Sequence, residues 1–295
     1  MNQDNPDIET AHISLHGNRR YNQDRYAVLN YEDCYLLVLA DGLGGHPKGE
    51  VAAEYLIHAA ELFFPKQFDR NLPIEPFFQL IINHAHRETV KFGLQEVPPI
   101  QPRTTAVLAL IKDEEVHWGH VGDSRLYLFR NQKVMFRTKD HTYKQELIRR
   151  GIDVKTQVNN KNMGALVRCV GGGKNPPTIE MGPLVPLLVK DVLVLCSDGF
   201  WGQLDPRNIC RAFEDPASLS IILAALGQQA LETAFPKSDN VTAVALRKWR
   251  MQSKKLKTNS KDSSKVKKMQ SVDELDNAID SLEEFIKKVE QDLKE

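Results

Sequence analysis

The sequence predicts a protein of the α+β class, in which strands and helices are both numerous but do not alternate regularly. Two observations support this prediction. Short apolar runs typical of strands are scattered over the first 250 residues, and helical patterns occur in pairs between them. A regular βαβ repeat would instead place a helix after each strand. The pairing of the helices therefore argues against a Rossmann-type fold.

Each expected strand is a short run that is apolar throughout or alternates between apolar and polar residues. These runs are Tyr35–Ala40, Thr104–Ile111, Val116–Val121, Arg125–Phe129, Val192–Cys196 and Val241–Leu246. Helical spacing of apolar residues covers segments at about Gly49–Phe63, Pro76–Phe92, Tyr143–Arg150 and Ser218–Thr233. A further short helix is expected to run from Asp205 to Cys210, because aspartate followed by proline is typical of a helix N-terminus.

The composition changes near residue 250, where the predicted folded domain, residues 1–250, ends. Residues 251–270 are rich in lysine and serine and poor in apolar residues, which predicts a flexible basic linker. Residues 271–295 regain apolar residues at alternating spacings of four and three, the heptad pattern of an amphipathic helix. A solvated tether before this helix favours pairing with a partner helix over docking on its own domain.

The charge and cysteine content narrow the class of protein further. Lysine plus arginine equals aspartate plus glutamate, at 39 each, which argues against general nucleic-acid binding. The polar, acidic N-terminus does not resemble a signal peptide, and no apolar run approaches the roughly 20 residues of a membrane span. We therefore expect a cytoplasmic protein. Its four cysteines show no CxxC spacing and are expected to be free thiols.

Aspartates fall at the ends of expected strands from distant parts of the chain. Asp41 ends YLLVLA, Asp198 follows VLVLC and Asp239 precedes VTAVAL; three others lie in short polar motifs, namely Asp24, Asp123 and Asp140. Each alone has an ordinary explanation, because aspartate and glycine are frequent in turns. If the strand ends converge, however, cations must offset the repulsion between the carboxylates. Oxygen ligands of this kind favour Mg²⁺, Mn²⁺ or Ca²⁺ over zinc or copper.

Two such ions would activate a water molecule and orient a phosphoryl oxygen. Arg19, five residues before Asp24, offers an always-charged planar fork for a phosphate, although a solvent-exposed arginine is the ordinary alternative. His46 and His141 lie beside candidate ligands, and either is open as a general acid. The sequence contains neither GxxxxGK[ST] nor GxGxxG, so it does not indicate nucleotide binding.

The ordered motifs RRYNQD, DGLGGH, GDSR, KDH, GALVRCVGG, SDGFW and SDNVT resemble those of the metal-dependent protein phosphatases. These are the type 2C serine/threonine phosphatases, and the bacterial stand-alone branch is the most similar. The motifs extend from Arg19 to Thr242, which is nearly all of the chain before the basic segment. The resemblance implies a central β-sandwich of two antiparallel sheets flanked by helices on both sides (α-β-β-α), with the metals in a cleft at one end.

The resemblance also implies a set of metal ligands. Asp41 would bridge two Mg²⁺ or Mn²⁺ ions, and the carbonyl of Gly42 would bind one of them. Asp198 and Asp239 would complete the first metal site. A third, weaker ion would be held by Asp140 together with Asp198.

Three further residues gain roles from the resemblance. Gln23 and Asp24 would hold metal-bound waters, and Arg19 would bind the substrate phosphate. The sequence departs from the family pattern at Leu43, where animal members carry a histidine proposed as the general acid, so the proton donor is unassigned. It departs again at Arg103, in place of a small residue, and in the segment Gly151–Gly164, which bears on substrate preference more than on chemistry.

These features predict an enzyme that hydrolyses phosphoserine and phosphothreonine in proteins by attack of a metal-activated water. Its expected partners are phosphorylated proteins and a cognate serine/threonine kinase. One alternative is a pseudophosphatase that binds a kinase or a phosphoprotein without turnover, although the full set of predicted metal ligands argues against it. A second alternative is an assembly subunit that acts mainly through residues 271–295.

Overall fold

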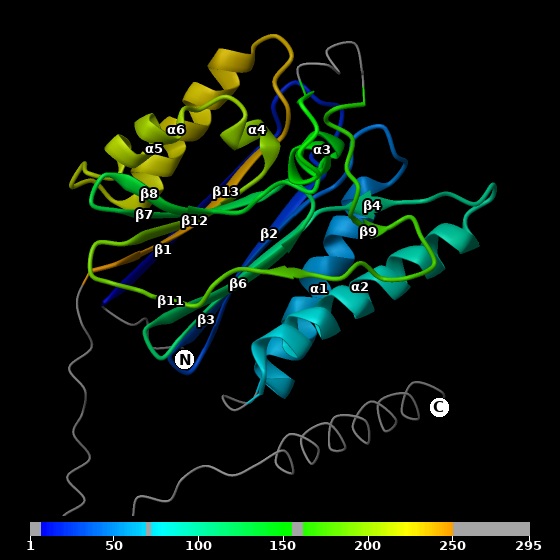
Figure 1. Ribbon diagram of the computed structural model, residues 1–295, viewed down its shortest axis with the longest axis horizontal. Helices are drawn as coiled ribbons and strands as arrows, with labels where there is room; N and C mark the ends of the chain where they lie inside the picture. Colours follow the sequence, from blue (N-terminus) through cyan, green and yellow to red (C-terminus); the bar gives the residue numbers. More distant parts are fainter. Residues whose placement is uncertain (1–6, 69–71, 155–161, 250–295) are drawn as a thin grey trace, which may run out of the picture. The chain divides into compact units, whose positions relative to one another are not determined.

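A computed structural model of the protein describes residues 7–68, 72–154 and 162–249 (Figure 1). The predicted linker (251–270) and the predicted heptad helix (271–295) lie outside the described residues, as does much of the departing segment Gly151–Gly164. No helix in the described ranges combines the length and the apolar character that a membrane span requires.

The first sheet joins the two ends of the described chain. Its strands are β1 (Ile8–Leu15), β13 (Val241–Lys248), β12 (Val192–Cys196), β7 (Arg125–Arg130) and β8 (Lys133–Arg137), in that spatial order. Every neighbouring pair is antiparallel. In the pairing of β1 with β13, Ile8 lies opposite Lys248 and Leu15 lies opposite Val241.

The second sheet is also antiparallel and contains the first hairpin of the chain. Its spatial order is β10 (Glu180–Met181), β6 (Glu115–Val121), β5 (Ala106–Lys112), β3 (Cys34–Asp41) and β2 (Asp24–Tyr31). The short β11 (Val185–Pro186) also pairs with β6. A separate two-stranded ladder joins β4 (Arg103–Thr104) to β9 (Val170–Gly171) beside the end of this sheet.

The two sheets pack face to face, because alternate residues of their strands are apolar on the inner side. Leu37 and Leu39 of β3 belong to a core cluster with Leu193 and Leu195 of β12 and with Leu246 of β13. The other face of β3 is also apolar, so all its residues from Cys34 to Ala40 are buried. A strand buried on both faces needs a further layer to cover its outer side.

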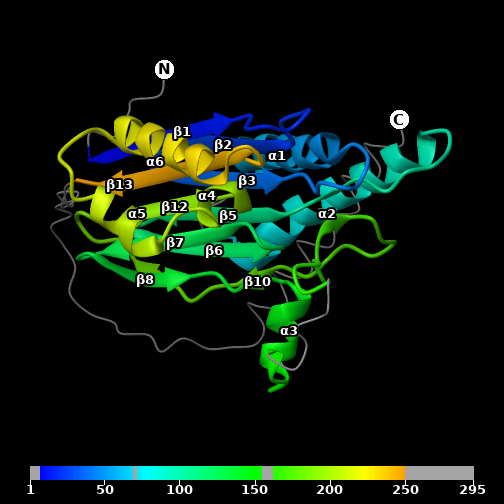
Figure 2. The same ribbon diagram turned by 90° about the horizontal axis from the view of Figure 1, so that it is seen from above.

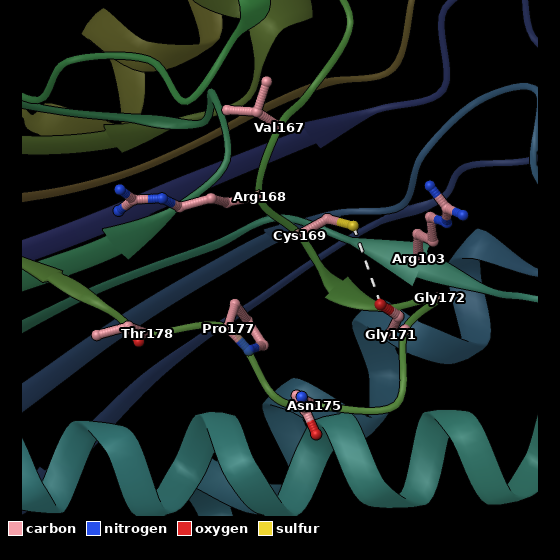
Figure 3. Close-up of a pocket in the computed structure, with 10 residues that line it drawn as sticks. Arg103, Val167, Arg168, Cys169, Gly171, Gly172, Asn175, Pro177 and Thr178 are labelled. Atoms are coloured by element: carbon pink, nitrogen blue, oxygen red, sulfur yellow. Dashed lines mark hydrogen bonds between the residues drawn. The ribbon is translucent and has the colours of Figure 1, made fainter. Parts of the chain in front are cut away.

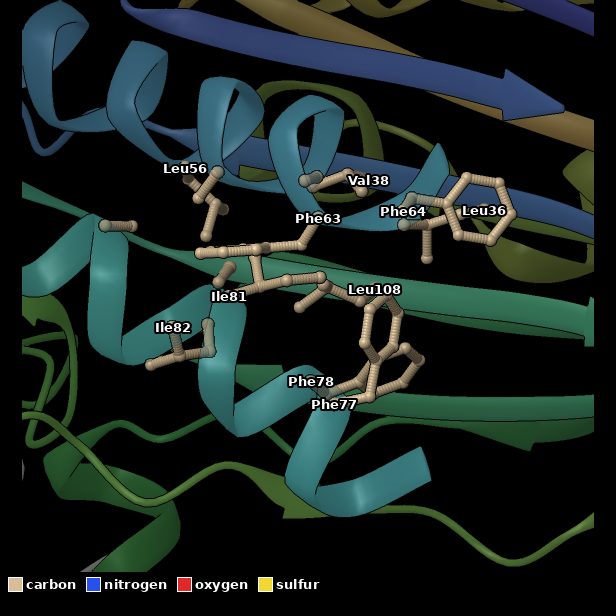
Figure 4. Packing of buried hydrophobic residues seen from close by; sticks show 14 of the residues in the cluster. Leu36, Val38, Leu56, Phe63, Phe64, Phe77, Phe78, Ile81, Ile82 and Leu108 are labelled. Carbon is tan, nitrogen blue, oxygen red and sulfur yellow. The ribbon is translucent and has the colours of Figure 1, made fainter. Parts of the chain in front are cut away.

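Helices supply that layer on both sides of the sandwich (Figures 1 and 2). The outer face of the second sheet is covered by α1 (Gly49–Gln67) and α2 (Ile74–Gln95), where Phe64, Phe78 and Ile81 pack on Leu36 and Leu108 (Figure 4). The first sheet is covered by α5 (Pro206–Ala212) and α6 (Leu219–Ala234), together with the single turn α4 (Asp198–Trp201). The predicted α-β-β-α arrangement is therefore confirmed.

One helix stands outside these layers. The helix α3 (Tyr143–Arg149) projects below the strands in Figure 2. Its N-cap is Thr142, whose hydroxyl accepts a hydrogen bond from the backbone N–H of Gln145. It follows Asp140 in the chain, so it begins next to a predicted metal ligand.

Candidate active site

The ends of both sheets bring the predicted ligands together. Asp41 is the last residue of β3, Asp198 follows β12 as the first residue of α4, and Asp239 lies just before β13. These three carboxylates and that of Asp123 line one cavity of about 460 Å³. Strands from different sheets therefore deliver four carboxylates to one place.

The backbone of Asp41 is held by two threonines that follow Arg103. The N–H of Asp41 donates to the hydroxyl of Thr105 at 2.9 Å, and its carbonyl accepts from the N–H of Thr105 at 2.9 Å. The hydroxyl of Thr104 donates to the same carbonyl at 2.9 Å. Both threonines are buried. The paired hydroxyls thus fix the direction from which the Asp41 carboxylate enters the cavity.

The Asp-Gly turn also needs its glycine for steric reasons. A Cβ on Gly42 would lie 2.5 Å from the carbonyl carbon of Gly49, at the start of α1. Only glycine permits so close an approach of two backbone segments. Gly42 itself lines the cavity.

The acidic side chains that line the cavity raise one another's pKa values. Burial, and then the charges of Asp24, Asp198, Asp123 and Asp239, raise the pKa of Asp41 well above its usual range. Burial and the nearby Asp198 and Asp140 charges raise the pKa of Asp123 to about 7. The Asp198 carboxyl lies within hydrogen-bonding reach of Asp41, and its pKa is also raised, chiefly by burial and by Asp239.

Buried carboxylates that repel one another become partly protonated unless cations offset their charge. A set made only of oxygen donors suits Mg²⁺ or Mn²⁺. The residues present therefore fit the predicted metal centre: they offer oxygen ligands, and a bound cation would relieve the repulsion between them.

Gln23 and Asp24 occupy different positions relative to the cavity. Gln23 lines it, and its side-chain amide donates to Glu50 at 3.0 Å. Asp24 is buried behind it, directly opposite Asp41 in the β2–β3 ladder, and accepts a hydrogen bond of 2.8 Å from the Ser197 hydroxyl. Burial, opposed in part by hydrogen bonds from Thr242 and Ser197, raises the pKa of Asp24 to about 6.

Arg19 reaches the cavity through an ion pair with Asp239. About half of its side chain remains exposed, at 49%. The guanidinium therefore faces a predicted metal ligand on one side and solvent on the other. This position is consistent with the predicted contact to a substrate phosphate.

Asp140 does not line the cavity, unlike Asp123. Both oxygens of Asp140 accept hydrogen bonds of 2.8 Å from Arg125, whose guanidinium lies 3.3 Å from the ring centroid of Trp201. The Trp201 indole N–H in turn donates to the Asp123 carbonyl at 3.0 Å. Asp140 thus orients the segment that carries Asp123. Sequence reasoning noted Asp123 but did not include it among the ligands.

The two histidines that are candidates for the general acid differ in position. His46 lines the cavity, its Nδ1 is buried without a hydrogen-bond partner, and burial followed by the charge of Arg103 lowers its pKa. His141 does not line the cavity: its Nδ1 accepts from the N–H of Gly122, so Nε2 carries the proton and donates to Glu180 at 3.0 Å.

His141 instead belongs to a cluster with His120, which is also buried, and Glu180, which is exposed. The two imidazole rings stack with centroids 4.4 Å apart, and burial, then His120, lowers the pKa of His141 to about 4. The three side chains offer ligand atoms within 4.8 Å of one another. Hydrogen bonds already engage both nitrogens of His141 and Nε2 of His120, which donates to the Lys139 carbonyl at 2.7 Å. The cluster joins the loops around Asp140 to β10.

Residues 13–235 match the sequence pattern of the protein phosphatase 2C family. This chain is a member of that family. As a type 2C phosphatase it is a metal-dependent protein phosphatase, as the motifs predicted, and the reading as a binding protein without turnover is not favoured. All four cysteines are free, also as predicted.

Curated relatives of this type 2C phosphatase come from several bacteria. The serine/threonine phosphatase stp of Listeria monocytogenes is 30% identical over 209 residues, covering 68% of this chain and 81% of the relative. The serine/threonine protein phosphatase PstP of Mycobacterium tuberculosis is 28% identical over 221 residues, covering 72% of this chain and 40% of the relative.

Solved structures share the fold. The Mycobacterium tuberculosis PstP structure is 26% identical with a TM-score of 0.69, and the match covers 82% of this chain and 99% of that one. A serine/threonine phosphatase of S. agalactiae is 24% identical with a TM-score of 0.73, covering 81% of this chain and 99% of that one. The PstP catalytic domain has also been solved with two manganese ions, at 26% identity and a TM-score of 0.66, covering 82% of this chain and 99% of that one.

Proposed function

We propose that this protein phosphatase hydrolyses phosphoserine and phosphothreonine residues, using two Mg²⁺ or Mn²⁺ ions and a third, weaker one. The observation that carries the proposal is the meeting of four carboxylates from both sheets in one cavity, with Arg19 beside them. Asp41, the Gly42 carbonyl, Asp198 and Asp239 would hold the two principal ions. When bound, these ions activate a water and offset the negative charge of the phosphate.

For the third ion we favour Asp123 with Asp198 as ligands. Asp123 lines the cavity with a raised pKa, whereas Arg125 occupies both oxygens of Asp140. The predicted direct role of Asp140 therefore becomes the weaker of the two assignments.

The residues of this chain position the substrate and its water. Arg19 binds the phosphate through charge-assisted hydrogen bonds. Gln23 holds water molecules in the cavity, and Asp24 acts from behind the cavity lining, where it is buried opposite Asp41. Water attacks phosphorus and the bond to the serine or threonine oxygen breaks. The leaving oxygen gains one proton, which balances the proton that the attacking water loses, so the products are inorganic phosphate and a free hydroxyl side chain.

Several finer features belong to the same proposal. The catalytic domain comprises residues 1–250, residues 251–270 act as a tether, and residues 271–295 bind a partner helix. The substrates are phosphoproteins of the cytoplasm, made by a cognate serine/threonine kinase.

Three peptides that share one flanking sequence but carry phosphoserine, phosphothreonine or phosphotyrosine test the substrate class. Phosphate release with Mn²⁺ should be faster from the first two than from the phosphotyrosine peptide. Hydrolysis of the phosphotyrosine peptide alone would contradict the proposed function.

A further inference from the structure

A second cavity adjoins the carboxylate-lined cavity and has the opposite charge. It measures about 680 Å³ and is lined by Arg103 and Arg168, with small and polar residues between them (Figure 3). Within the part of the chain that the structure describes, no aspartate or glutamate lines it. The two cavities share Arg103 and Cys169, so Arg103 stands at the boundary between the anionic and the cationic space.

The backbone holds Arg103 at this boundary. In the β4–β9 ladder Arg103 pairs with Gly171. Its carbonyl accepts a hydrogen bond of 2.9 Å from the N–H of Leu43, in the loop that follows Asp41. The position of Arg103 is therefore fixed relative to the predicted metal ligands.

The side chain of Arg103 lies over a glycine that leaves room for it. Gly172 has φ +74°, and a Cβ built on it would lie 2.3 Å from Nε of Arg103. In Figure 3 the guanidinium of Arg168 points away from Arg103, while the sulfur of Cys169 lies on the Arg103 side. The two arginines thus do not act as one cluster.

The guanidinium of Arg103 has unused hydrogen-bonding capacity. Its Nη2 donates to Gln101 at 3.0 Å, but Nε is buried and has no partner. No carboxylate among the described residues forms an ion pair with Arg103, whereas Arg19 pairs with Asp239 and Arg168 lies 3.6 Å from Glu180. Because Nε is packed against the backbone of Gly172, an anion reaches the guanidinium through its terminal nitrogens. A planar guanidinium is suited to bind a carboxylate or a phosphate.

We propose that Arg103 forms a subsite for an anionic side chain of the substrate, either an acidic residue or a second phosphorylated residue close to the phosphate that is hydrolysed. This inference rests on the proposed hydrolysis of phosphoproteins. The adjoining cavity offers a flanking acidic side chain the guanidinium of Arg103, with which no carboxylate among the described residues forms an ion pair. Arg103 thereby makes the enzyme selective for acidic or multiply phosphorylated sequences.

Phosphothreonine peptides with a systematic substitution test this subsite. Alanine, glutamate, lysine or phosphoserine is placed in turn at each of the three positions before and after the phosphothreonine, and kcat/KM is measured for each peptide. The wild-type enzyme should favour glutamate over alanine at one or two positions by about fivefold to tenfold, as expected for a charge-assisted contact that is partly exposed. Phosphoserine, with its greater charge, should be favoured more strongly.

The ratio of kcat/KM for the glutamate and alanine peptides is the readout in the variants, because it is independent of the overall rate. In Arg103→Ala and Arg103→Gln it should fall to about one, and in Arg103→Glu the lysine peptide should become the preferred one. Arg207→Ala, which removes an exposed arginine that lines neither cavity, should keep the wild-type ratio. The glutamine variant retains the size of the side chain and gives the same readout if the alanine variant does not fold.

Each other outcome has a definite meaning. An effect of phosphoserine without an effect of glutamate assigns the subsite to a second phosphate. A wild-type enzyme with no anionic preference, or an unchanged ratio in all three Arg103 variants, overturns the inference. A wild-type enzyme that hydrolyses an aryl phosphate but none of the phosphopeptides contradicts the proposed function instead.

Discussion

Arg19 lies in the carboxylate cavity as the ion-pair partner of Asp239, and an entering phosphate offers its guanidinium a second anionic partner. We expect Arg19→Ala to raise KM, because the contact forms already in the ground state. A lost charge-assisted contact costs about 1.5–3 kcal/mol, and since Arg19 is half exposed, the loss in kcat/KM should lie near tenfold. Steady-state kinetics on a phosphothreonine peptide measure it. Unchanged kinetics would remove Arg19 from the substrate site.

Asp123 and Asp140 differ in their expected effects on turnover and stability. Asp123→Asn removes a charge from the cavity, so it should lower kcat and weaken the response to high Mn²⁺ concentration. Asp140→Asn keeps one acceptor oxygen, so it removes one of the two hydrogen bonds from Arg125 together with the charge that pairs with it, and it should lower stability more than it lowers kcat at saturating metal. Metal titrations of activity, paired with thermal denaturation of each variant, separate the two effects. The reverse pattern would restore Asp140 as a direct ligand.

The sequence predicted most of the residues that line this cavity, but it did not predict the hydrogen bonds that hold them in place. Asp41, Asp198 and Asp239 stood out because each adjoins an apolar run that predicts a strand. Thr105 and Ser197 form hydrogen bonds to Asp41 and Asp24 across 64 and 173 residues of sequence, and such contacts have no local signature. Asp123 was noted as a motif residue, but only the cavity distinguishes it from Asp140.

At the level of elements, strands that are buried on both faces were predicted and those at the edges were not. The runs of β3, β5 and β12 are apolar throughout, because both faces are covered. The edge strands β1 and β2 carry polar residues, and only one residue of β1 and two of β2 are buried, so the apolar pattern is weak. Their conformation depends on pairing, of β1 with β13 and of β2 with β3. The partner of β1 lies at the other end of the described chain, so the sequence around β1 does not reveal it.

The ends of β7 and β12 are joined by a buried ion pair that offers a test of stability. Asp191 is fully buried and accepts hydrogen bonds of 2.8 and 2.7 Å from Arg130. Arg130→Ala leaves this carboxylate without its counter-charge, which should lower the free energy of unfolding by about 3 kcal/mol. Urea denaturation measures the change. Arg207→Ala breaks an exposed pair and should leave the midpoint unchanged; equal effects of the two variants would contradict the role of the buried pair.

For the whole molecule, the sequence pattern after residue 250 predicts that catalysis and recruitment are separable. We expect a chain ending at residue 250 to retain hydrolysis of an aryl phosphate, because the two sheets and their helices are complete by the end of β13. The same truncation should abolish binding to the partner of the heptad helix. Activity assays and size-exclusion chromatography of the two forms test this prediction. Loss of activity on the small substrate would show that residues 251–295 belong to the catalytic fold.

We infer that carboxylates from both sheets form a metal centre on which phosphate hydrolysis depends, and metal removal tests this dependence most directly. Phosphate release from a phosphothreonine peptide should vanish after exhaustive chelation and return on addition of Mn²⁺ or Mg²⁺. Asp41→Asn should remain folded yet stay inactive at any metal concentration, because Asp41 is the predicted bridging ligand. Full activity of the chelated wild-type enzyme, or recovery of Asp41→Asn by added metal to the wild-type rate, would contradict the account.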